Sequence, residues 1–412
     1  MLLKKLSVIF AVVLTASAMT FSAGAESYVA INEKNFPDEI FREYVSEEFD
    51  KNGDGKLSKK EISGAKKINV QGDDIESLAG IEYFTELVDL YCDFNELDHL
   101  DVSKNTKLVN LYCGYNSLTS LDVSKNTELV KLYCTRNSIS SLDVSKNTKL
   151  VDLGCGSNYL KKLDVSNNPR LAVLDCHFNF KISKLDVSKN TELVGLYCDY
   201  NSLKKLDVSK NTKLARLDCS DNLLNELDLS KNTKLTYVEC YNNNIKTLDV
   251  SKNKLLEKFI FERNELESID LSQNTKLKYL DCSYNKLKSL DLSKNPKLTI
   301  LLCHGNKLTS LDLSKNTKLY VDYDADYMRF NCDFNEFVVS AAVGEKYDVA
   351  NLEKYGFDPQ NASNWQGAYY NKKTNTLRIK RNTITYDYDT GGKIDGSDEN
   401  RIVKFTLIAK EK

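Results

Sequence analysis

Several features are scarce in this chain of 412 residues, and each scarcity argues against a class of function. The formal net charge is only -2, which argues against nucleic acid or an acidic lipid surface as an obligatory partner. The three histidines, His99, His177 and His304, lie far apart, and there is no Cys-x-x-Cys motif, so no histidine or cysteine metal site is expected. Beyond the N-terminal segment, no apolar run approaches the ~20 residues that a membrane span needs.

Catalytic signatures are also missing from the sequence. We find no Ser–His–Asp or Cys–His constellation, no phosphate-binding loop, and no unusual residue set that suggests a pocket. Carboxylates are numerous, but they recur at one fixed spacing. The sequence therefore predicts that the protein is not an enzyme.

The N-terminal segment, residues 1–25, has the composition of a secretory signal peptide. Lys4 and Lys5 form the charged region, residues 6–19 are apolar, and Ala23-Gly-Ala25 is a small-x-small cleavage site. No cysteine stands at the cleavage point, and residues 407–412 carry no wall-sorting motif. We expect residues 1–25 to be removed, and the mature chain to be extracellular, either released or held at the cell surface without a covalent anchor.

What the sequence has in abundance is one repeated unit, written for example as LVNLYCGYNSLTSLDVSKNTE in residues 108–128. Variants follow one another about eleven times, in register with the cysteines. The cysteine spacing is 21 except for one step of 22 and one of 42, where Phe261 takes the skipped position. The cysteines of the repeats are Cys92, Cys113, Cys134, Cys155, Cys176, Cys198, Cys219, Cys240, Cys282 and Cys303. Such a period indicates a solenoid, in which each unit buries its apolar face against its neighbours.

Two segments of the unit have the pattern of a strand with one buried face. Residues 111–113 (Leu-Tyr-Cys) and 121–123 (Leu-Asp-Val) each alternate between apolar and polar positions. Asn116 and Asn126 follow them at the same offset, where an inward Asn can satisfy backbone groups of a bend. We therefore predict two short strands and two bends in each unit.

The repeat resembles the leucine-rich repeat, L-x-x-L-x-L-x-x-N-x-L. The match is to the short bacterial subclass, whose unit combines a half of ten residues with a half of eleven residues. The resemblance covers about 82–321 and implies a mainly β solenoid. We expect its cysteines to be free, because parallel side chains on strands ~4.8 Å apart have poor geometry for a disulfide. The substitution by Phe261 indicates that the position requires apolar volume, which a free cysteine also supplies.

Residues 26–81 differ from the repeats and are expected to form a helical cap. A helix is predicted from about residue 35, with Pro37 in its first turn and an apolar face formed by Ile40, Phe41, Tyr44, Val45 and Phe49. A short second helix is predicted near Ile62. A first, irregular repeat is expected at residues 75–81.

Between the two predicted helices, residues 50–61 (DKNGDGKLSKKE) look like an EF-hand calcium loop at every position. The resemblance implies Ca²⁺ ligands from Asp50, Asn52, Asp54, the backbone carbonyl of Lys56, Ser58 through a water, and a bidentate Glu61. Because the loop is single, we expect a structural ion that ties the cap to the first repeat. The alternative is a degenerate loop that keeps only the shape.

Residues 322–412 lack the period and contain short alternating runs at 337–339, 377–380, 384–388 and 402–408. Turn-rich segments at 389–392 and 395–398 are expected to separate some of them. This pattern predicts a small β-sandwich of the immunoglobulin-like kind, which would also cap the open end of the solenoid. The order of helical cap, repeats and sandwich resembles the internalins of bacterial surfaces.

Two columns of outward side chains are the candidate surfaces. The first is rich in aromatic residues and includes the partner-binding candidates Tyr91, Tyr112, Tyr115, Tyr133, Tyr197 and Tyr200. Alternatively, these tyrosines only stack on one another as strand residues do. The second is a column of aspartates, such as Asp122, for which Ser124 and Lys125 are the expected partners. A cation-binding ladder is the alternative for the aspartates.

Together these observations predict a secreted, non-catalytic binding protein. Its repeat face would engage a host or neighbouring-cell surface protein, as in protein–protein interaction or adhesion, and the protein would be a monomer. A carbohydrate-binding protein with tyrosines stacking on sugars is the second hypothesis. A rigid spacer of roughly 50 Å is the third.

Overall fold

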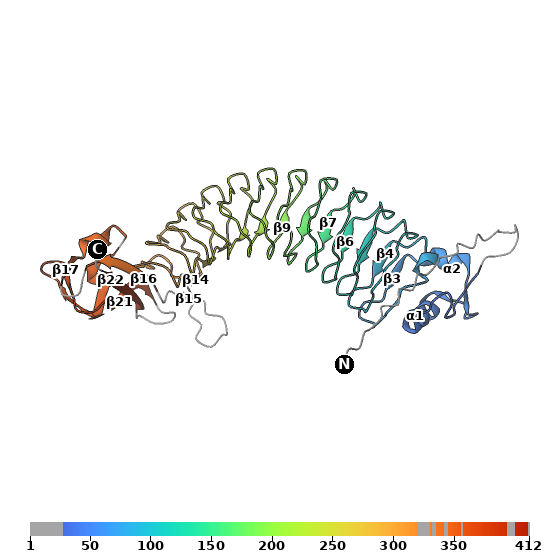
Figure 1. Ribbon diagram of the computed structural model, residues 1–412, viewed down its shortest axis with the longest axis horizontal. Helices are drawn as coiled ribbons and strands as arrows, with labels where there is room; N and C mark the ends of the chain where they lie inside the picture. Colours follow the sequence, from blue (N-terminus) through green and yellow to red (C-terminus); the bar gives the residue numbers. More distant parts are fainter. Residues whose placement is uncertain are drawn as a thin grey trace, which may run out of the picture.

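The computed structural model describes residues 28–319, 330–331, 335–341, 345–355, 357–393 and 400–410. These residues form a curved solenoid with a helical unit at its N-terminal end and a β-rich unit at its C-terminal end (Figure 1). The signal peptide predicted for residues 1–25 lies outside the described residues. Within the described part of the chain, no helix has the length and apolar character needed to cross a membrane.

The N-terminal unit consists of two short strands and two helices: β1 (Val29–Ala30), α1 (Glu39–Phe49), β2 (Lys56–Leu57) and α2 (Lys59–Gly64). The helices confirm the prediction for this region, but α1 begins later than expected. Asp38 caps it by accepting the Phe41 N–H at 2.9 Å, so Pro37 precedes the helix. Phe41 and Val45 are buried, whereas Ile40 is 42% exposed and does not belong to the buried face.

The solenoid contains one parallel sheet of 13 strands, to which each repeat adds one strand in sequence order. The strands are β3 (Lys67–Asn69), β4 (Asp89–Tyr91), β5 (Asn110–Tyr112), β6 (Lys131–Tyr133), β7 (Asp152–Gly154), β8 (Val173–Asp175), β9 (Gly195–Tyr197), β10 (Arg216–Asp218), β11 (Tyr237–Glu239), β12 (Lys258–Ile260), β13 (Tyr279–Asp281), β14 (Ile300–Leu302) and β15 (Phe330–Asn331). A 3-10 turn, η1 (Ile81–Tyr83), precedes β4. Because β3 begins at Lys67, the sheet starts before residue 82, where the repeats were expected to begin.

The second strand predicted for each unit does not form. In residues 121–123, Leu121 and Val123 are buried and Asp122 is exposed, but the segment pairs with no strand. The reason is the curvature: the paired strands line the inner edge of the arc, and the turns fan apart on the outer edge (Figure 1). Strand pairing requires a spacing of ~4.8 Å, which only the inner edge maintains.

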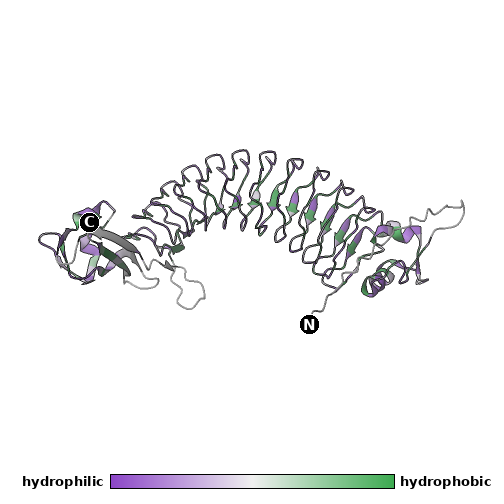
Figure 2. Ribbon diagram, viewed as in Figure 1, coloured by the Kyte–Doolittle hydropathy of each residue, from purple (hydrophilic) through white to green (hydrophobic). Residues whose placement is uncertain are grey.

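The solenoid core is built from stacked columns of buried side chains. Strand residues such as Leu111 are fully buried, and Figure 2 shows hydrophobic and hydrophilic segments alternating around the turns. The predicted inward asparagines are confirmed. Asn116 Nδ2 donates to the carbonyl of Cys92 at 2.9 Å, and Asn126 Nδ2 donates to the carbonyl of Val102 at 2.9 Å. Each repeat thus uses two asparagines to pair backbone groups of its bends.

The cysteines follow the prediction with one exception. Nine of them, from Cys92 to Cys282, are buried free thiols, and burial raises the pKa of each thiol. Cys303, however, is disulfide-bonded, so the expectation of free cysteines is wrong there. Cys303 directly follows β14, which still pairs in parallel with β15, so parallel pairing of neighbouring strands does not by itself exclude a disulfide.

The C-terminal unit has two sheets, with strand orders β16-β22-β21-β18 and β17-β20-β19. Its elements are β16 (Glu336–Ser340), β17 (Lys346–Asp348), α3 (Ala350–Glu353), η2 (Pro359–Asn361), β18 (Ala362–Gln366), β19 (Ala368–Asn371), β20 (Thr376–Ile379), β21 (Thr383–Lys393) and β22 (Asn400–Lys410). The pairs are antiparallel except β16 with β22, which is parallel. Tyr386, fully buried, donates its hydroxyl to the carbonyl of Thr309, which joins this unit to the last repeat.

One predicted turn in this unit is wrong. Residues 389–392 continue strand β21. The pairing of β21 with β22 shifts register between Asp389 and Lys393, so the two glycines lie in an irregular part of the strand. The other predicted turn, residues 395–398, lies outside the described residues.

Candidate functional site

The inner, concave edge of the solenoid is the candidate binding face. Each strand buries its middle residue and directs its first and third residues outward, as β5 does with Asn110 and Tyr112 on either side of Leu111. The strands pair in register from one repeat to the next, so equivalent outward residues form continuous columns. Side chains that are one whole repeat apart in sequence therefore become neighbours on this face.

Three of the predicted tyrosines form one stack near the N-terminal end of the face. The ring centroids of Tyr91 and Tyr112 are 4.9 Å apart, as are those of Tyr112 and Tyr133, with interplanar angles of 16° and 10°. The rings are partly buried but keep an exposed edge. The stack ends at Gly154, where an added Cβ would lie 2.5 Å from Cδ1 of Tyr133. Gly154 therefore provides the space in which Tyr133 lies.

Tyr115 belongs to a second column, two residues after the cysteine. It stacks on Phe94 with 4.0 Å between centroids, and the Arg136 guanidinium lies 5.1 Å from its ring. Every described non-glycine residue of this column, from Phe94 to Tyr284, has a φ near +50°. Sequence reasoning did not predict this left-handed conformation, because only Asp221, Asn242 and Gly305 of this column are residue types that normally indicate it.

The remaining predicted tyrosines, Tyr197 and Tyr200, lie apart from the stack. Gly154 and Asp175 occupy the positions between Tyr133 and Tyr197 in the same column. Tyr200 stacks on Phe178 at 3.9 Å and 12°. The six candidate tyrosines are thus divided between two separate regions of the solenoid.

The middle and C-terminal part of the concave face is acidic, a feature that the sequence analysis did not single out. We call it the acidic segment; it comprises Asp175, Asp199, Asp218, Glu239, Glu262 and Asp281. Burial raises the pKa of Asp199 to about 6 and that of Asp218 to about 7, and mutual repulsion contributes. Lys258 offsets part of this charge by pairing with Glu239 at 2.9 Å.

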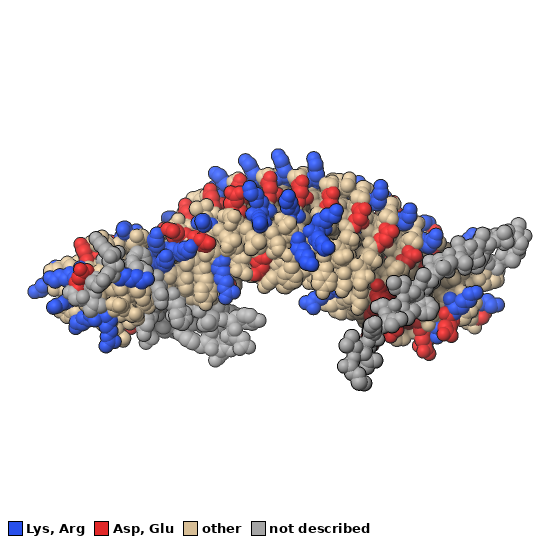
Figure 3. Space-filling view, viewed as in Figure 1, with Lys and Arg blue, Asp and Glu red and all other residues tan. Residues whose placement is uncertain are grey.

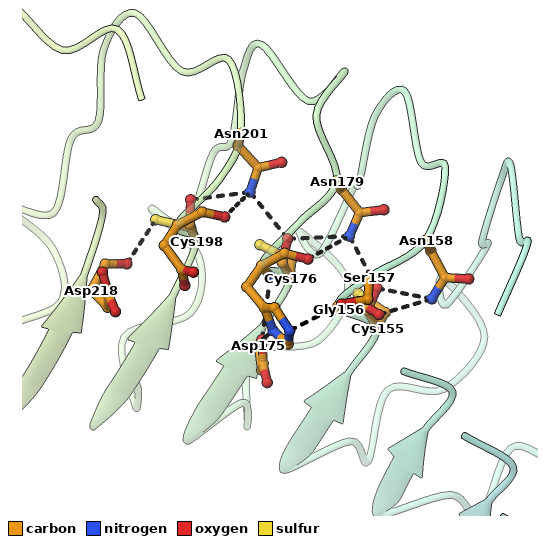
Figure 4. A network of polar contacts seen from close by, with 12 residues as sticks. Cys155, Gly156, Ser157, Asn158, Asp175, Cys176, Asn179, Cys198, Asn201 and Asp218 are labelled. Atoms are coloured by element: carbon orange, nitrogen blue, oxygen red, sulfur yellow. Dashed lines mark hydrogen bonds and ion pairs between the residues drawn. The ribbon is translucent and has the colours of Figure 1, made fainter. Parts of the chain in front are cut away.

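The structure also corrects the expectation that no Ser–His–Asp constellation exists. His177 Nδ1 lies 2.5 Å from Oδ1 of Asp175, and Nε2 lies 3.2 Å from Oγ of Ser157 in the preceding repeat. Figure 4 shows Asp175 and Ser157 in this network. An added Cβ at Gly156 would lie 2.3 Å from the His177 ring, so glycine is required for the contact. The sequence conceals the constellation because its members belong to different repeats.

This group of side chains links two successive repeats. The hydrogen bond that His177 donates to Asp175 raises the pKa of His177, because the carboxylate stabilises the imidazolium. In the imidazolium form the ring donates to both Asp175 and Ser157.

The column of aspartates on the outer edge is stabilised mainly by backbone groups. Asp122 Oδ1 accepts the Ser124 N–H at 2.8 Å, and this bond holds the pKa of Asp122 below its usual range. The predicted role of the serine is therefore confirmed. Lys125 acts only at longer range, and the ion pairs among the described lysines of the outer edge join glutamates, as Lys149 with Glu128 at 2.6 Å does. Figure 3 shows the resulting rows of basic and acidic side chains along the outer edge.

The loop between α1 and α2 turns sharply at two glycines. Gly53 and Gly55 have φ values of +69° and +73°. Asp50 Oδ1 accepts the Gly53 N–H at 2.9 Å, and Asp50 Oδ2 accepts the Gly55 N–H at 2.8 Å. β2, within the loop, pairs with β1. These bonds close a compact turn around the carboxylate of Asp50.

The donor set of this loop suits a hard cation, but its carboxylates are engaged elsewhere. Glu61 Oε1 accepts the Lys51 N–H at 2.9 Å, and Oε2 accepts the Ser58 N–H at 2.8 Å, completing a capping box for α2. Asp54 Oδ1 accepts the Lys56 N–H at 3.0 Å. Across the described residues, no group of three or more His, Cys, Asp and Glu side chains is gathered as a metal site. Asp50 Oδ1 and Glu61 Oε2 each accept two hydrogen bonds, whereas Asp50 Oδ2 and Asp54 Oδ1 accept one each and keep a lone pair for a ligand bond.

The fold defines a leucine-rich-repeat solenoid with a column of buried cysteines, and comparison with known proteins supports this class. No known family profile and no curated protein matches the chain. Among solved structures, the functional domain of InlJ from Listeria monocytogenes, which includes a cysteine ladder, is similar at a TM-score of 0.63 and 28% identity, covering 94% of this chain and 100% of that chain.

Two further structures are similar at lower identity, which indicates a shared fold only. One is an internalin, InlF, from Listeria monocytogenes, with a TM-score of 0.58 and 23% identity over 71% of this chain and 83% of that chain. The other is a leucine-rich-repeat protein of Leptospira interrogans, with a TM-score of 0.53 and 22% identity over 63% of this chain and 79% of that chain. These neighbours are repeat proteins of the internalin and leucine-rich-repeat kinds.

Proposed function

We propose that this protein is an extracellular binding module that engages a protein partner through the concave face of its solenoid. The observation that carries the proposal is the composition of that face: a stack of partly exposed tyrosines adjoins the acidic segment. Tyrosine supplies rigid contact area with a polar tip, and is enriched where protein interfaces have their strongest contacts. The internalin-like neighbours and the predicted signal peptide support an extracellular location.

The acidic segment defines the charge of the partner. Within this segment Asp199 and Asp218 are partly buried, and burial and neighbouring carboxylates raise the pKa of each. They gain most from a basic surface, because a nearby cation lowers their pKa and offsets the repulsion. The partner that fits is therefore a surface protein with exposed apolar groups flanked by lysine or arginine. Association should slow as ionic strength rises, since electrostatic steering is screened by salt.

The proposal is tested by binding of the chain without residues 1–25 to immobilised surface proteins and polysaccharides. Combined replacement Tyr112→Ala and Tyr133→Ala should weaken binding to a protein partner about 10- to 100-fold, because stacked aromatic anchors dominate such interfaces. Gly154→Ala should weaken it as well, since the added methyl group displaces Tyr133 without removing a ring.

The matched control is Tyr159→Ala, which removes a tyrosine that is 60% exposed and lies in the turn after Asn158, off the strands of the concave face. This variant should bind as the parent does. The proposal would be contradicted if Tyr159→Ala lost as much binding affinity as the stack variants. It would also be contradicted if no protein partner were found whose binding depends on the stack.

We further propose that the loop at 50–61 binds a structural Ca²⁺ through Asp50, Asn52, Asp54, Lys56, Ser58 and Glu61. The oxygen-only donor set supports this, and the ion would supply rigidity to the cap. Adding calcium should raise the melting temperature of the cap by several degrees, and magnesium should not substitute.

Glu61→Gln should abolish the effect of calcium on melting, whereas Glu47→Gln, on the exposed side of α1, should preserve it. The measurement is a thermal melt with calcium or with chelator, accompanied by calorimetric titration. A melt that calcium leaves unchanged, with no heat of binding, would show that the loop keeps only the shape of an EF-hand.

A further inference from the structure

Three consecutive repeats carry lysines on one flank of the solenoid, at positions where the adjoining repeats are not basic. The positions are the two residues before a buried leucine, namely Leu163, Leu185 or Leu206. We call the exposed lysines at these positions the basic strip; they are Lys161, Lys162, Lys184, Lys204 and Lys205. The adjoining repeats have Thr119, Ser120, Ser140, Ser141, Asn225 and Glu226 there. Figure 3 shows basic side chains gathered on this flank at the middle of the arc, beneath the rows of the outer edge.

Side chains at these positions reach one another across one repeat. In later repeats Glu267 and Lys288 occupy the first of the two positions, and Lys288 Nζ lies 2.8 Å from Glu267 Oε2. In the basic strip the second position instead holds three like charges in succession, Lys162, Lys184 and Lys205. Among the described residues, no carboxylate lies within ion-pair distance of any lysine of the strip. The repulsion between successive lysines is therefore not offset by a direct ion pair.

The strip lines a groove between two neighbouring turns. This groove has a volume of about 720 Å³, and Lys184, Lys204 and Lys205 line it. The volume lies within the range of ligand pockets. In later repeats the equivalent groove has acidic charged lining residues, which are Glu226, Asp228, Asp249 and Asp270. Both grooves contain aspartates of the outer column, so the lysines account for the difference in charge.

Those aspartates restrict the shape of a ligand for the strip. In its three repeats they are Asp164, Asp186 and Asp207, and each accepts a serine N–H at 2.9 Å. The hydrogen bonds from serine hold the pKa of each aspartate below its usual range, so the carboxylates stay ionised. A column of negative charge therefore runs beside the basic strip. A linear anion can follow the strip alone, whereas a flat anionic lipid surface would also meet the aspartates.

Exposed aromatic rings precede the strip in two of its repeats. Tyr159, two residues before Lys161, and Phe180, four residues before Lys184, are each 60% exposed. Phe180 packs edge-on against Phe178, with 5.7 Å between the ring centroids. An exposed ring offers a flat apolar surface, which suits the apolar face of a sugar ring.

We propose that the basic strip binds a linear acidic polysaccharide, which lies across the turns with its carboxylate or sulfate groups between lysines of successive repeats. Such an anion accepts charge-assisted hydrogen bonds from two ammonium groups and offsets their repulsion. The rings of Tyr159 and Phe180 would contact the sugar rings. The strip lies on the flank, off the strands of the concave face, so the proposal does not depend on the protein partner proposed above.

The experiment measures binding to the chain without residues 1–25 by calorimetry. The acidic probes are a heparin oligosaccharide, which carries sulfate groups, and a polygalacturonate oligosaccharide, which carries only carboxylates. A maltodextrin is the neutral counterpart, and oligothymidylate is the nucleic-acid counterpart. At least one acidic oligosaccharide should bind more tightly than both counterparts. Raising the NaCl concentration from about 50 mM to about 200 mM should weaken that binding at least about tenfold, because each lysine–anion contact releases counterions.

Two triple variants with the same change in net charge locate the site. The strip variant replaces by glutamine the three successive lysines of one column: Lys162→Gln, Lys184→Gln and Lys205→Gln. It should weaken binding of the acidic oligosaccharide at least about tenfold. The control variant replaces three exposed lysines of the outer edge: Lys125→Gln, Lys146→Gln and Lys189→Gln. It should change the affinity by less than about twofold, because these lysines lie outside the strip.

A substitution that lengthens the strip provides the opposite test. Glu226 is exposed and occupies the next position of the column after Lys205. Glu226→Lys should therefore strengthen binding of the acidic oligosaccharide by about threefold or more. Unfolding cannot produce such a gain, and melting temperatures of all the variants check that the chains are folded.

Each contrary result overturns the proposal in a different way. Failure of the folded chain to bind either acidic oligosaccharide excludes an acidic polysaccharide. Equal losses in the strip and control variants would show that binding follows net charge and not the strip. Tighter binding of oligothymidylate would identify a nucleic-acid surface, and equal binding of the maltodextrin would exclude recognition of charge. The concave face is tested with other residues, so these outcomes are distinct from failure of the protein-binding proposal.

Discussion

Replacing Asn147 by alanine should lower the free energy of unfolding by about 2–4 kcal/mol. Asn147 is fully buried, and its Nδ2 donates to the carbonyls of Val123 at 3.0 Å and Asn126 at 2.9 Å. Alanine removes one of the two donors that each carbonyl has, because Val123 keeps the Asn126 N–H and Asn126 keeps the Leu129 N–H. It also opens a small cavity, and both effects destabilise the native state. Asn147→Asp should be still more damaging at neutral pH, because it places a carboxylate against the same two carbonyls.

The measurement is urea unfolding followed by circular dichroism, with Lys146→Ala as the control on the neighbouring exposed residue. That control should change stability by less than about 0.5 kcal/mol. Because a repeat array can open in parts, hydrogen exchange should also show faster exchange in the repeats flanking residue 147. A change in Asn147→Ala no larger than in Lys146→Ala would contradict the role assigned to the asparagine ladder.

Replacing Asp218 by asparagine should have the opposite effect and stabilise the protein at pH 8, by about 1–3 kcal/mol. Burial and the neighbouring Asp199 raise the pKa of Asp218 to about 7, against about 4 in an unfolded chain. Above pH 7 the native state therefore holds an ionised carboxylate in unfavourable surroundings. Asparagine removes that charge and can still accept the Ser220 N–H, which lies 3.1 Å from Oδ1.

The sign of the pH dependence follows from the direction of the shift. Between about pH 4 and pH 7 the native state holds a proton at Asp218 that the unfolded state has released, so stability falls as pH rises. The advantage of Asp218→Asn should therefore disappear on acidification to about pH 4. Urea unfolding at pH 4, 6 and 8 measures this directly.

Asp228→Asn is the matched control, because Asp228 occupies the exposed outer column. The Ser230 N–H lowers the pKa of Asp228, so this substitution should not stabilise the protein at pH 8. The account would be contradicted if Asp218→Asn were destabilising at pH 8, or stabilising by the same amount at pH 4. Either result would show that ionisation of Asp218 does not destabilise the native state.

The repeat made much of the fold predictable. Leu111 and Cys113 recur with a period that only a stack of equivalent turns can bury, and the two asparagines of each unit mark where the bends need side-chain partners. The EF-hand-like loop was recognisable because its residues lie within twelve positions of one another. Both patterns are local, so that sequence spacing translates directly into structure.

Other features depend on contacts between repeats. The curvature prevents residues 121–123 from pairing, although their alternation is that of a strand. The contacts of His177 with Ser157 and of Tyr133 with the space above Gly154 join residues of successive repeats. The sequence alone determined the period, the core columns and the bends, because each repeat encodes them locally. The tertiary structure decided which outward side chains share a surface and how their charges interact, because these depend on the distances between turns.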